Sequence, residues 1–222
     1  MAAHVAVVVV RLTFRPEAAT LRDLMAVFDA GNERTLAAWW TAALLAGAAA
    51  AAVLVAELAR RADSSPAEVR AWRVLAVVFA LLSLDEIVSL HERGAAWTAS
   101  VLDAGSPLVR LGWMIPAAAI LVLSLVVLVP AFRAIPRRPR RIIVAGLGTA
   151  VAGALGMEFV NVMLVDAGAA LRWRYLAMAV EEAAEMGGVV IVLAGISLAV
   201  RGRYSDGSMV LTYQSRDAAG TR

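Results

Sequence analysis

The chain has 222 residues and no cysteine; 61% of its residues are hydrophobic, 18% are charged, and arginine without any lysine gives it a net charge of +3. Soluble domains carry about half apolar and a quarter charged residues, so this composition indicates a lipid-embedded chain and excludes disordered chains, disulfide scaffolds and thiolate metal sites. Because the arginines stand between apolar segments, they indicate membrane topology and no binding of nucleic acid.

Five apolar segments are long enough to cross a bilayer, which needs about 20 helical residues. In chain order they are residues 36–58, 72–90, 111–132, 142–165 and 175–200. We therefore expect an all-α integral membrane bundle of about five transmembrane helices over residues 36–200. An amphipathic, interfacial segment over residues 1–35 is expected before it, and a flexible polar tail over residues 201–222 after it.

The arginines are distributed unequally between the two sides of these segments. Most of them follow the first, third and fifth segments, which places them on one side. The longest run is expected to lie at anionic lipid headgroups and consists of Arg133, Arg137, Arg138, Arg140 and Arg141. The positive-inside rule then predicts a bacterial-type inner (plasma) membrane protein with its N-terminus outside and its C-terminus in the cytoplasm.

The tryptophans are predicted to anchor the helices at the two membrane interfaces, where amphipathic rings collect. They are Trp39, Trp40, Trp72, Trp97, Trp113 and Trp173.

Ionisable side chains inside three of the segments are the main functional signal, because each costs at least about 2.5–3.5 kcal/mol at the bilayer centre. The candidate ligands or acid–base groups are Asp85, Glu86, His91, Glu92, Glu158, Glu182 and Glu185, with Ser89, Asn161 and Glu181 as supporting polar residues. Since successive helices alternate in direction, all of them are expected in the same leaflet. We therefore expect them to converge on one internal chamber.

Helical spacing sorts these residues into faces. Asp85, Ser89 and Glu92 follow i, i+4, i+7 and are predicted to form one stripe, while Glu182 and Glu185 follow i, i+3.

Small residues next to the acids are predicted to allow close helix contact. Gly148, Ala152 and Gly156 recur every four residues just before Glu158, and Gly187 and Gly188 follow Glu185.

The motifs 84–86 (Leu-Asp-Glu), 91–92 (His-Glu) and 181–187 (Glu-Glu-Ala-Ala-Glu-Met-Gly) resemble those of a broad group of uncharacterised bacterial multi-pass membrane proteins. The resemblance covers roughly residues 28–199. It implies an integral membrane protein with shared acidic motifs and transfers no activity.

Several carboxylates in one poorly solvated chamber cannot all be ionised without a compensating charge. A divalent metal ion held by carboxylates and His91, or protons held by the carboxylates, would supply it. Three functions remain open at this point: a transport or sensing component that binds a divalent cation or relays protons, a metal- or acid/base-dependent enzyme acting on a lipid-like substrate, and a structural or assembly subunit without chemistry. The sequence leaves undecided whether the protein is an enzyme.

Overall fold

The computed structural model describes residues 35–89, 93, 100, 114–205 and 207–215. Their elements are α3 (Leu36–Arg61), α4 (Pro66–Val88), α6 (Met114–Ala134), α7 (Arg137–Val151), the π-helix η2 (Ala152–Met157), α8 (Glu158–Asp166), α9 (Leu171–Ser197), β1 (Val200–Ser205) and β2 (Ser208–Tyr213). α7, η2 and α8 follow one another without a break and form one long rod. The described chain is mostly helical, which confirms the helical fold class.

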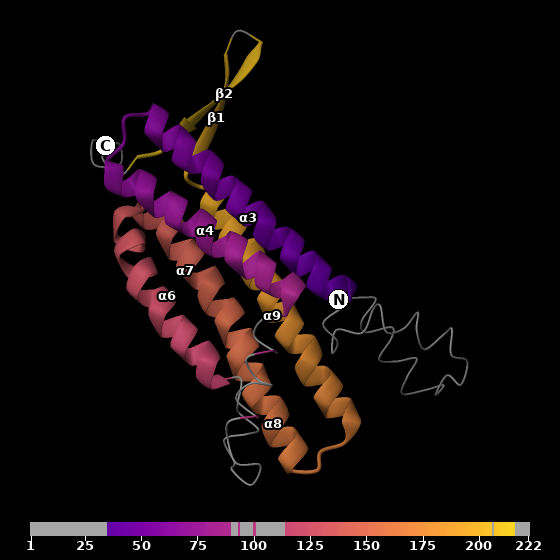
Figure 1. Cartoon of the computed structure of the whole chain (residues 1–222). Coiled ribbons are helices and arrows are strands. Elements are labelled where there is room, and N and C mark those ends of the chain that lie inside the picture. Colours follow the sequence, from indigo (N-terminus) through magenta and orange to yellow (C-terminus); the bar gives the residue numbers. More distant parts are fainter. Residues whose placement is uncertain (1–34, 90–92, 94–99, 101–113, 206, 216–222) are drawn as a thin grey trace.

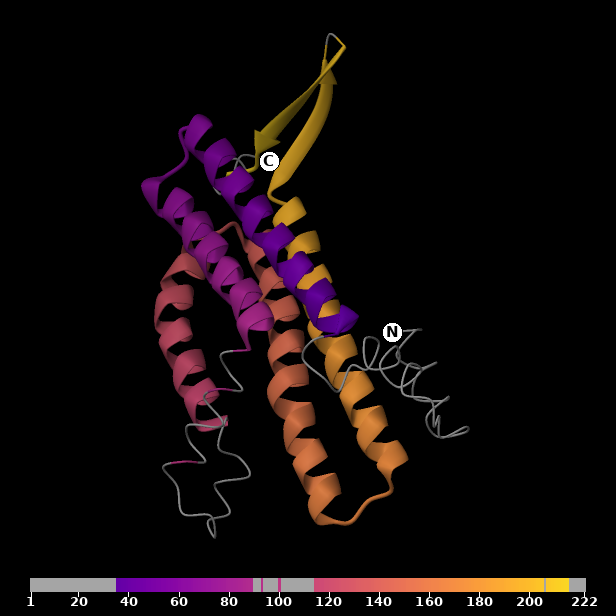
Figure 2. The ribbon, with the colours of Figure 1, turned by 45° about the vertical axis from the view of Figure 1, so that its right-hand side comes forward.

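The helices lie side by side in an elongated bundle (Figures 1 and 2). α4 packs on both α3 and α6, while α9 packs on α3 and on the rod that begins with α7. Successive helices run in opposite directions along the bundle. The arrangement places the α3–α4 turn, the α6–α7 turn and the end of α9 together at one end.

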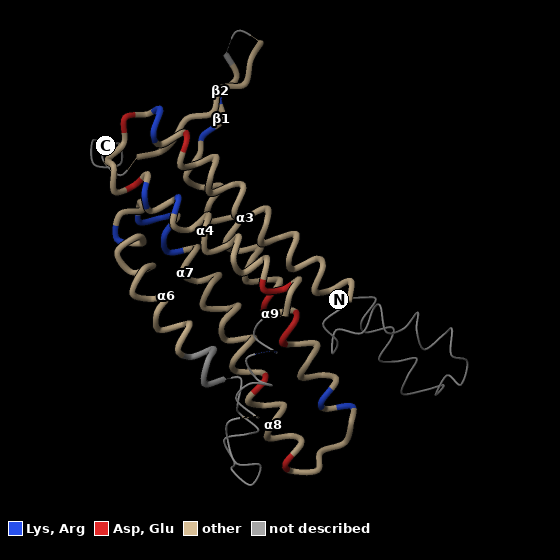
Figure 3. Tube along the Cα trace, viewed as in Figure 1, with Lys and Arg blue, Asp and Glu red and all other residues tan. Residues whose placement is uncertain are grey.

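That end holds most of the arginines of the described residues, and we call it the arginine-rich end (Figure 3). Its arginines are Arg60, Arg61, Arg70, Arg73, Arg133, Arg137, Arg138, Arg140, Arg141, Arg201 and Arg203. Arg172 and Arg174, at the start of α9, lie at the opposite end. The predicted grouping of the arginine-bearing turns on one side is therefore present in the fold.

Helix α4 begins and ends earlier than the predicted segment 72–90. The side chain of Ser65 accepts a hydrogen bond from the backbone N–H of Glu68 at 3.3 Å, and Pro66 occupies the first helical position. At the other end Ser89 adopts the left-handed conformation, with φ 53°, and ends the helix at Val88.

The core between α3 and α4 is built around Trp72, which is 0% exposed. Its Nε1 donates a buried hydrogen bond of 3.1 Å to the hydroxyl of Tyr213 on β2. The prediction that Trp72 is an interfacial anchor is therefore wrong, because its ring is fully buried in the core near the arginine-rich end. Trp39 and Trp40, in contrast, are 60% and 51% exposed, while Trp97 and Trp113 lie outside the described residues.

Glycines bring the backbones of α7 and α9 into direct contact. A Cβ atom built on Gly146 would lie 2.6 Å from the carbonyl oxygen of Gly188, and one built on Gly195 would lie 2.9 Å from the backbone nitrogen of Ile143. The predicted contact face was correct at Gly188. It was wrong at Gly148 and Gly156, since a Cβ atom on either would meet nothing within 4 Å.

Residues 200–213 form an antiparallel hairpin, so the prediction of a flexible tail from residue 201 is wrong for this part. Val200 pairs with Tyr213, and Tyr204 pairs with Met209. Alternate residues point to opposite faces of a strand, so Val200, Tyr204 and their partners Tyr213 and Met209 share one face, while Arg201 and Arg203 lie on the other, with Val210 opposite Arg203. The base of the hairpin belongs to the hydrophobic core through Tyr213.

Tyr213 gives this attachment a pH dependence. Burial raises the pKa of its phenol to about 12; the hydrogen bond from Trp72 lowers that pKa in part, and the charge of Glu68 raises it. Since the folded pKa lies above the unfolded value of about 10, the neutral phenol stabilises the fold fully below pH 10. This contribution is lost as the pH rises from about 10 to 12.

We therefore expect one tyrosine of the folded protein to ionise late in an ultraviolet absorbance titration, and Tyr213→Phe to remove that late transition. Circular dichroism recorded at the same pH values shows whether the fold persists. Ionisation of all tyrosines near pH 10 in the folded wild type would contradict the expectation.

Two helices of the described residues are long and apolar enough to cross a membrane. They are α3 and the continuous rod Arg137–Asp166, and α6 is apolar over Ala119–Ala134. Two of the five predicted transmembrane segments, 36–58 and 142–165, are therefore supported by the length and apolar composition of the observed helices.

Candidate functional site

The acidic residues predicted from the sequence lie on three neighbouring parts of the bundle. Asp85 and Glu86 are in the last turn of α4, Glu158 is the first residue of α8, and Glu181 and Glu182 lie near the middle of α9. Figure 3 shows these acids away from the arginine-rich end. Each of the five side chains is half-buried, so none is directed entirely outward.

Two of these carboxylates, Glu181 and Glu182 of α9, are within range of like-charge repulsion from acids on other helices. Glu181 interacts with Glu158 and with its neighbour Glu182, and Glu182 interacts with Glu86. We call Glu86, Glu158, Glu181 and Glu182 the acidic group. Glu181 is thus within range of the charge of an acid on α8, and Glu182 within range of the charge of an acid on α4. Convergence of the three helices on one chamber stays a prediction.

The π-helix η2 sets the position of Glu158. It occupies Ala152–Met157, directly before that residue, and its i→i+5 turns accommodate an extra residue compared with an α-helix. A Cβ atom on Gly153 would lie 2.8 Å from that of Ala184, so η2 and α9 are in close contact here. Spacing rules for a regular α-helix could not anticipate this change of phase.

Asn161, predicted as a supporting polar residue, lies one turn after Glu158 on α8. Its Oδ1 is buried and has no hydrogen-bond partner within the described structure, and the same holds for Nε of Arg174 on α9. Buried polar atoms are rarely left unpaired, so each such atom is a candidate contact for water or a ligand. Glu185, one turn after Glu181, is half-buried and has interactions of its own.

Comparison with known proteins gives one match. The model of a family described as Domain of unknown function (DUF8692) matches residues 1–200. The chain belongs to this family. The match ends at the first residue of β1, so nearly all of the hairpin lies beyond the matched DUF8692 region. No curated protein and no solved structure matches the chain.

In this DUF8692 protein, the described residues contain no group of three or more His, Asp or Glu side chains that could hold a metal ion. Of the predicted stripe Asp85–Ser89–Glu92, Asp85 lies on α4 and Ser89 is the residue that follows its end at Val88. His91 and Glu92 lie outside the described residues.

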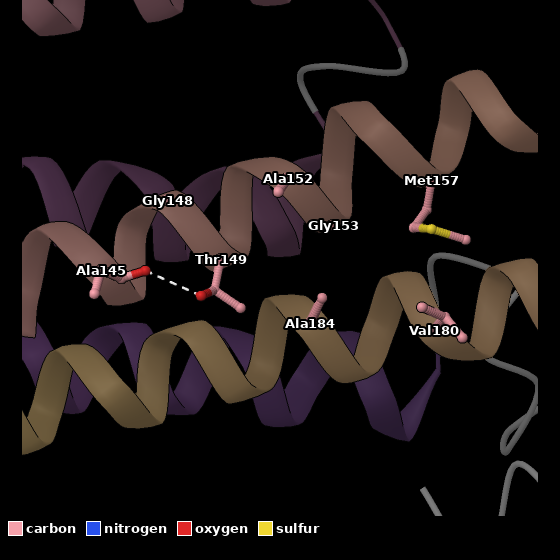
Figure 4. Close-up of a pocket in the computed structure, with 8 residues that line it drawn as sticks. All are labelled: Ala145, Gly148, Thr149, Ala152, Gly153, Met157, Val180 and Ala184. Carbon is pink, nitrogen blue, oxygen red and sulfur yellow. Dashed lines mark hydrogen bonds between the residues drawn. The ribbon is translucent and has the colours of Figure 1, made fainter.

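A hollow of about 450 Å³ opens on the surface beside η2 and α9 (Figure 4). Small and apolar residues line it: Ala145, Gly148, Thr149, Ala152, Gly153, Met157, Val180 and Ala184. The hydroxyl of Thr149, the only polar side chain among them, donates to the carbonyl oxygen of Ala145 at 3.0 Å. Met157 and Val180 directly precede Glu158 and Glu181 in the chain, so the hollow lies next to the acidic group, but none of the four carboxylates lines it.

Proposed function

We propose that this protein is a multi-pass membrane protein whose acidic group binds and passes protons as part of a transport or sensing component. In this proposal α3, α4, α6, the α7–α8 rod and α9 all cross a bacterial-type inner membrane, and the arginine-rich end faces the cytoplasm.

The dimensions and surfaces of the helices support the five crossings. α4, α6 and α9 contain 23, 21 and 27 residues, which correspond to about 35, 32 and 41 Å at 1.5 Å per residue. The hydrocarbon core is about 30 Å thick. Large apolar side chains are exposed on these helices, among them Ile87 at 69% and Val126 at 68%. Continuous apolar surface of this kind is typical of helices in contact with lipid.

The observation that carries the function is the placement of half-buried carboxylates on α4, α8 and α9, with Glu181 within range of the charge of Glu158 and Glu182 within range of that of Glu86. Acidic side chains inside a membrane bundle are costly and commonly form proton pathways. When two carboxylates lie close together in a poorly solvated place, one can hold a proton and share it with its neighbour. Two carboxylates are enough to exchange a proton, whereas a divalent metal ion needs more oxygen ligands around one point.

The test is proton flux into liposomes that contain the purified protein and a trapped pH-sensitive dye, driven by a potassium diffusion potential. We expect Glu181→Gln and Glu182→Gln each to lower the flux by at least about tenfold, because each removes an exchangeable proton from the acidic group. Glu57→Gln is the matched control, since Glu57 is a carboxylate of α3 at the arginine-rich end, where it pairs with Arg60 at 2.7 Å. Its flux should equal that of the wild type.

Well-folded Glu181→Gln and Glu182→Gln proteins with normal flux would contradict the proposal and favour a structural role for the acidic group. Infrared spectroscopy gives an independent measurement, because a protonated carboxyl has its own C=O stretch. A stoichiometric divalent metal in protein purified without chelator, lost in Glu158→Gln, would instead favour cation binding.

A further inference from the structure

The turn between α6 and α7 is a fixed part of the arginine-rich end. Ile135 in this turn is 0% exposed, and Pro136 and Pro139 on either side of the first residues of α7 are also buried. Nη1 of Arg140 donates to the carbonyl oxygen of Phe132 at 3.3 Å and joins the first turn of α7 to the end of α6. The backbone of the turn is therefore held in place.

Four arginine side chains are exposed on this fixed turn, namely Arg133, Arg137, Arg138 and Arg141. Three of them stand in the first turns of α7, where the start of the helix carries partial positive charge and where acidic residues are normally favoured. The first turn of α7 contains no acid, and its cap residue Pro136 makes no side-chain hydrogen bond. Positive charge therefore accumulates here, and an external anion would stabilise it.

Apolar side chains are exposed on several faces of α6, and one row of them leads up to this turn. Val122, Val126 and Val129 are 60%, 68% and 40% exposed, and together with Arg133 they follow i, i+4, i+7, i+11 on one helix face. We call these three residues the valine stripe. From Val122 to Arg133 the stripe and the arginine span about 16 Å, close to the depth of one leaflet of a 30 Å core.

We propose that the α6–α7 turn binds the phosphate of one anionic phospholipid, whose acyl chain lies along the valine stripe. The guanidinium groups supply charge and the paired N–H donors that match phosphate oxygens. The stripe selects a lipid over a soluble phosphate, because only a lipid presents an anion and a hydrocarbon chain in this order. The inference depends on α6 lying in the bilayer, as the proposed function has it, but not on proton binding.

The test uses native mass spectrometry on the full chain in detergent with equal amounts of phosphatidylglycerol and phosphatidylcholine. We expect the wild type to retain phosphatidylglycerol with at least about tenfold preference, and R137Q/R138Q to lower the affinity for it about 10- to 30-fold. R201Q/R203Q is the matched control, since it removes two exposed arginines from the same end. It should retain the lipid as the wild type does.

A third variant tests the acyl chain: Val126→Ser should weaken retention about fivefold through the lost apolar contact. Thermal unfolding of each variant shows that the fold is intact. Equal loss in R137Q/R138Q and R201Q/R203Q would overturn the proposal in favour of a diffuse charge effect. Unchanged retention in Val126→Ser, or displacement of the lipid by glycerol phosphate, would overturn the assignment to a lipid.

Discussion

Gly188→Ala is expected to destabilise the bundle by about 2–3 kcal/mol, a large effect for one methyl group. The new Cβ atom would lie 2.6 Å from the carbonyl oxygen of Gly146 and 2.7 Å from the backbone nitrogen of Ala150. Both are backbone atoms of α7, so no side-chain rotation can relieve the overlap and the two helices must move apart. Forced overpacking of this kind typically costs 1–3 kcal/mol, and here it also weakens the packing that positions α9.

Gly187→Ala is the matched control, because it adds the same methyl group one residue earlier in the same helix. A Cβ atom at Gly187 meets nothing within 4 Å, and alanine is favoured over glycine in a helix interior by about 1 kcal/mol. This variant should therefore be neutral or slightly more stable. Unfolding in a denaturing detergent, followed by circular dichroism, measures both. Equal stability of the two variants would contradict the close α7–α9 contact.

The glycines of the α7–α9 contact show how far sequence spacing could predict the packing of these two helices. The sequence shows many small residues in segments 142–165 and 175–200, and the helices were correctly expected to approach there. Which small residues make the contact depends on the rotation of each helix about its axis. A four-residue repeat selected Gly148 and Gly156, but the observed contact uses Gly146 and Gly153, which are seven residues apart. A regular repeat cannot determine helix rotation when several small residues are available.

The local sequence of residues 200–213 is compatible with the hairpin that the structure shows, although a flexible tail was predicted there. Arginines alternate with other residues over 200–204, residues 209–213 are apolar or β-branched except for Tyr213, and an Asp-Gly pair at 206–207 separates the two runs. Asp-Gly between two strand-forming segments favours a tight hairpin turn, and Gly207 indeed has a positive φ of 74°. The partner of the hairpin, Trp72, lies 141 residues away from Tyr213 along the chain, so its buried role could not be inferred from local pattern.

For the candidate site, acids inside apolar segments are conspicuous by composition alone, and the structure places half-buried carboxylates on α4, α8 and α9. The position of Glu158 relative to α9 could not be predicted, because the π-helical turns of η2 before it carry no periodic signal. Nor does helical spacing show that Ser89 adopts the left-handed conformation that ends α4.

Trp72→Ala is expected to lower the free energy of unfolding by about 3–5 kcal/mol, the usual cost of removing a large buried aromatic side chain. The indole is 0% exposed among residues of α3 and α4, including Leu75 and Phe79. Its loss leaves a cavity in this core and removes the hydrogen bond from Nε1 to the hydroxyl of Tyr213. Because that bond fixes the base of the hairpin, β1 and β2 should become more accessible to protease than in the wild type.

Two further substitutions separate the causes of that loss. Trp72→Phe keeps most of the ring volume and should cost less, with the missing hydrogen bond contributing about 1 kcal/mol. Trp40→Ala removes an equally large ring that is 51% exposed and should change unfolding in detergent by less than about 1 kcal/mol. Equal effects of Trp40→Ala and Trp72→Ala would contradict the burial of Trp72 in the core. If Trp72→Ala destabilised the helices but left the protease sensitivity of the hairpin unchanged, the hydrogen bond to Tyr213 would not be what holds β2 against the bundle.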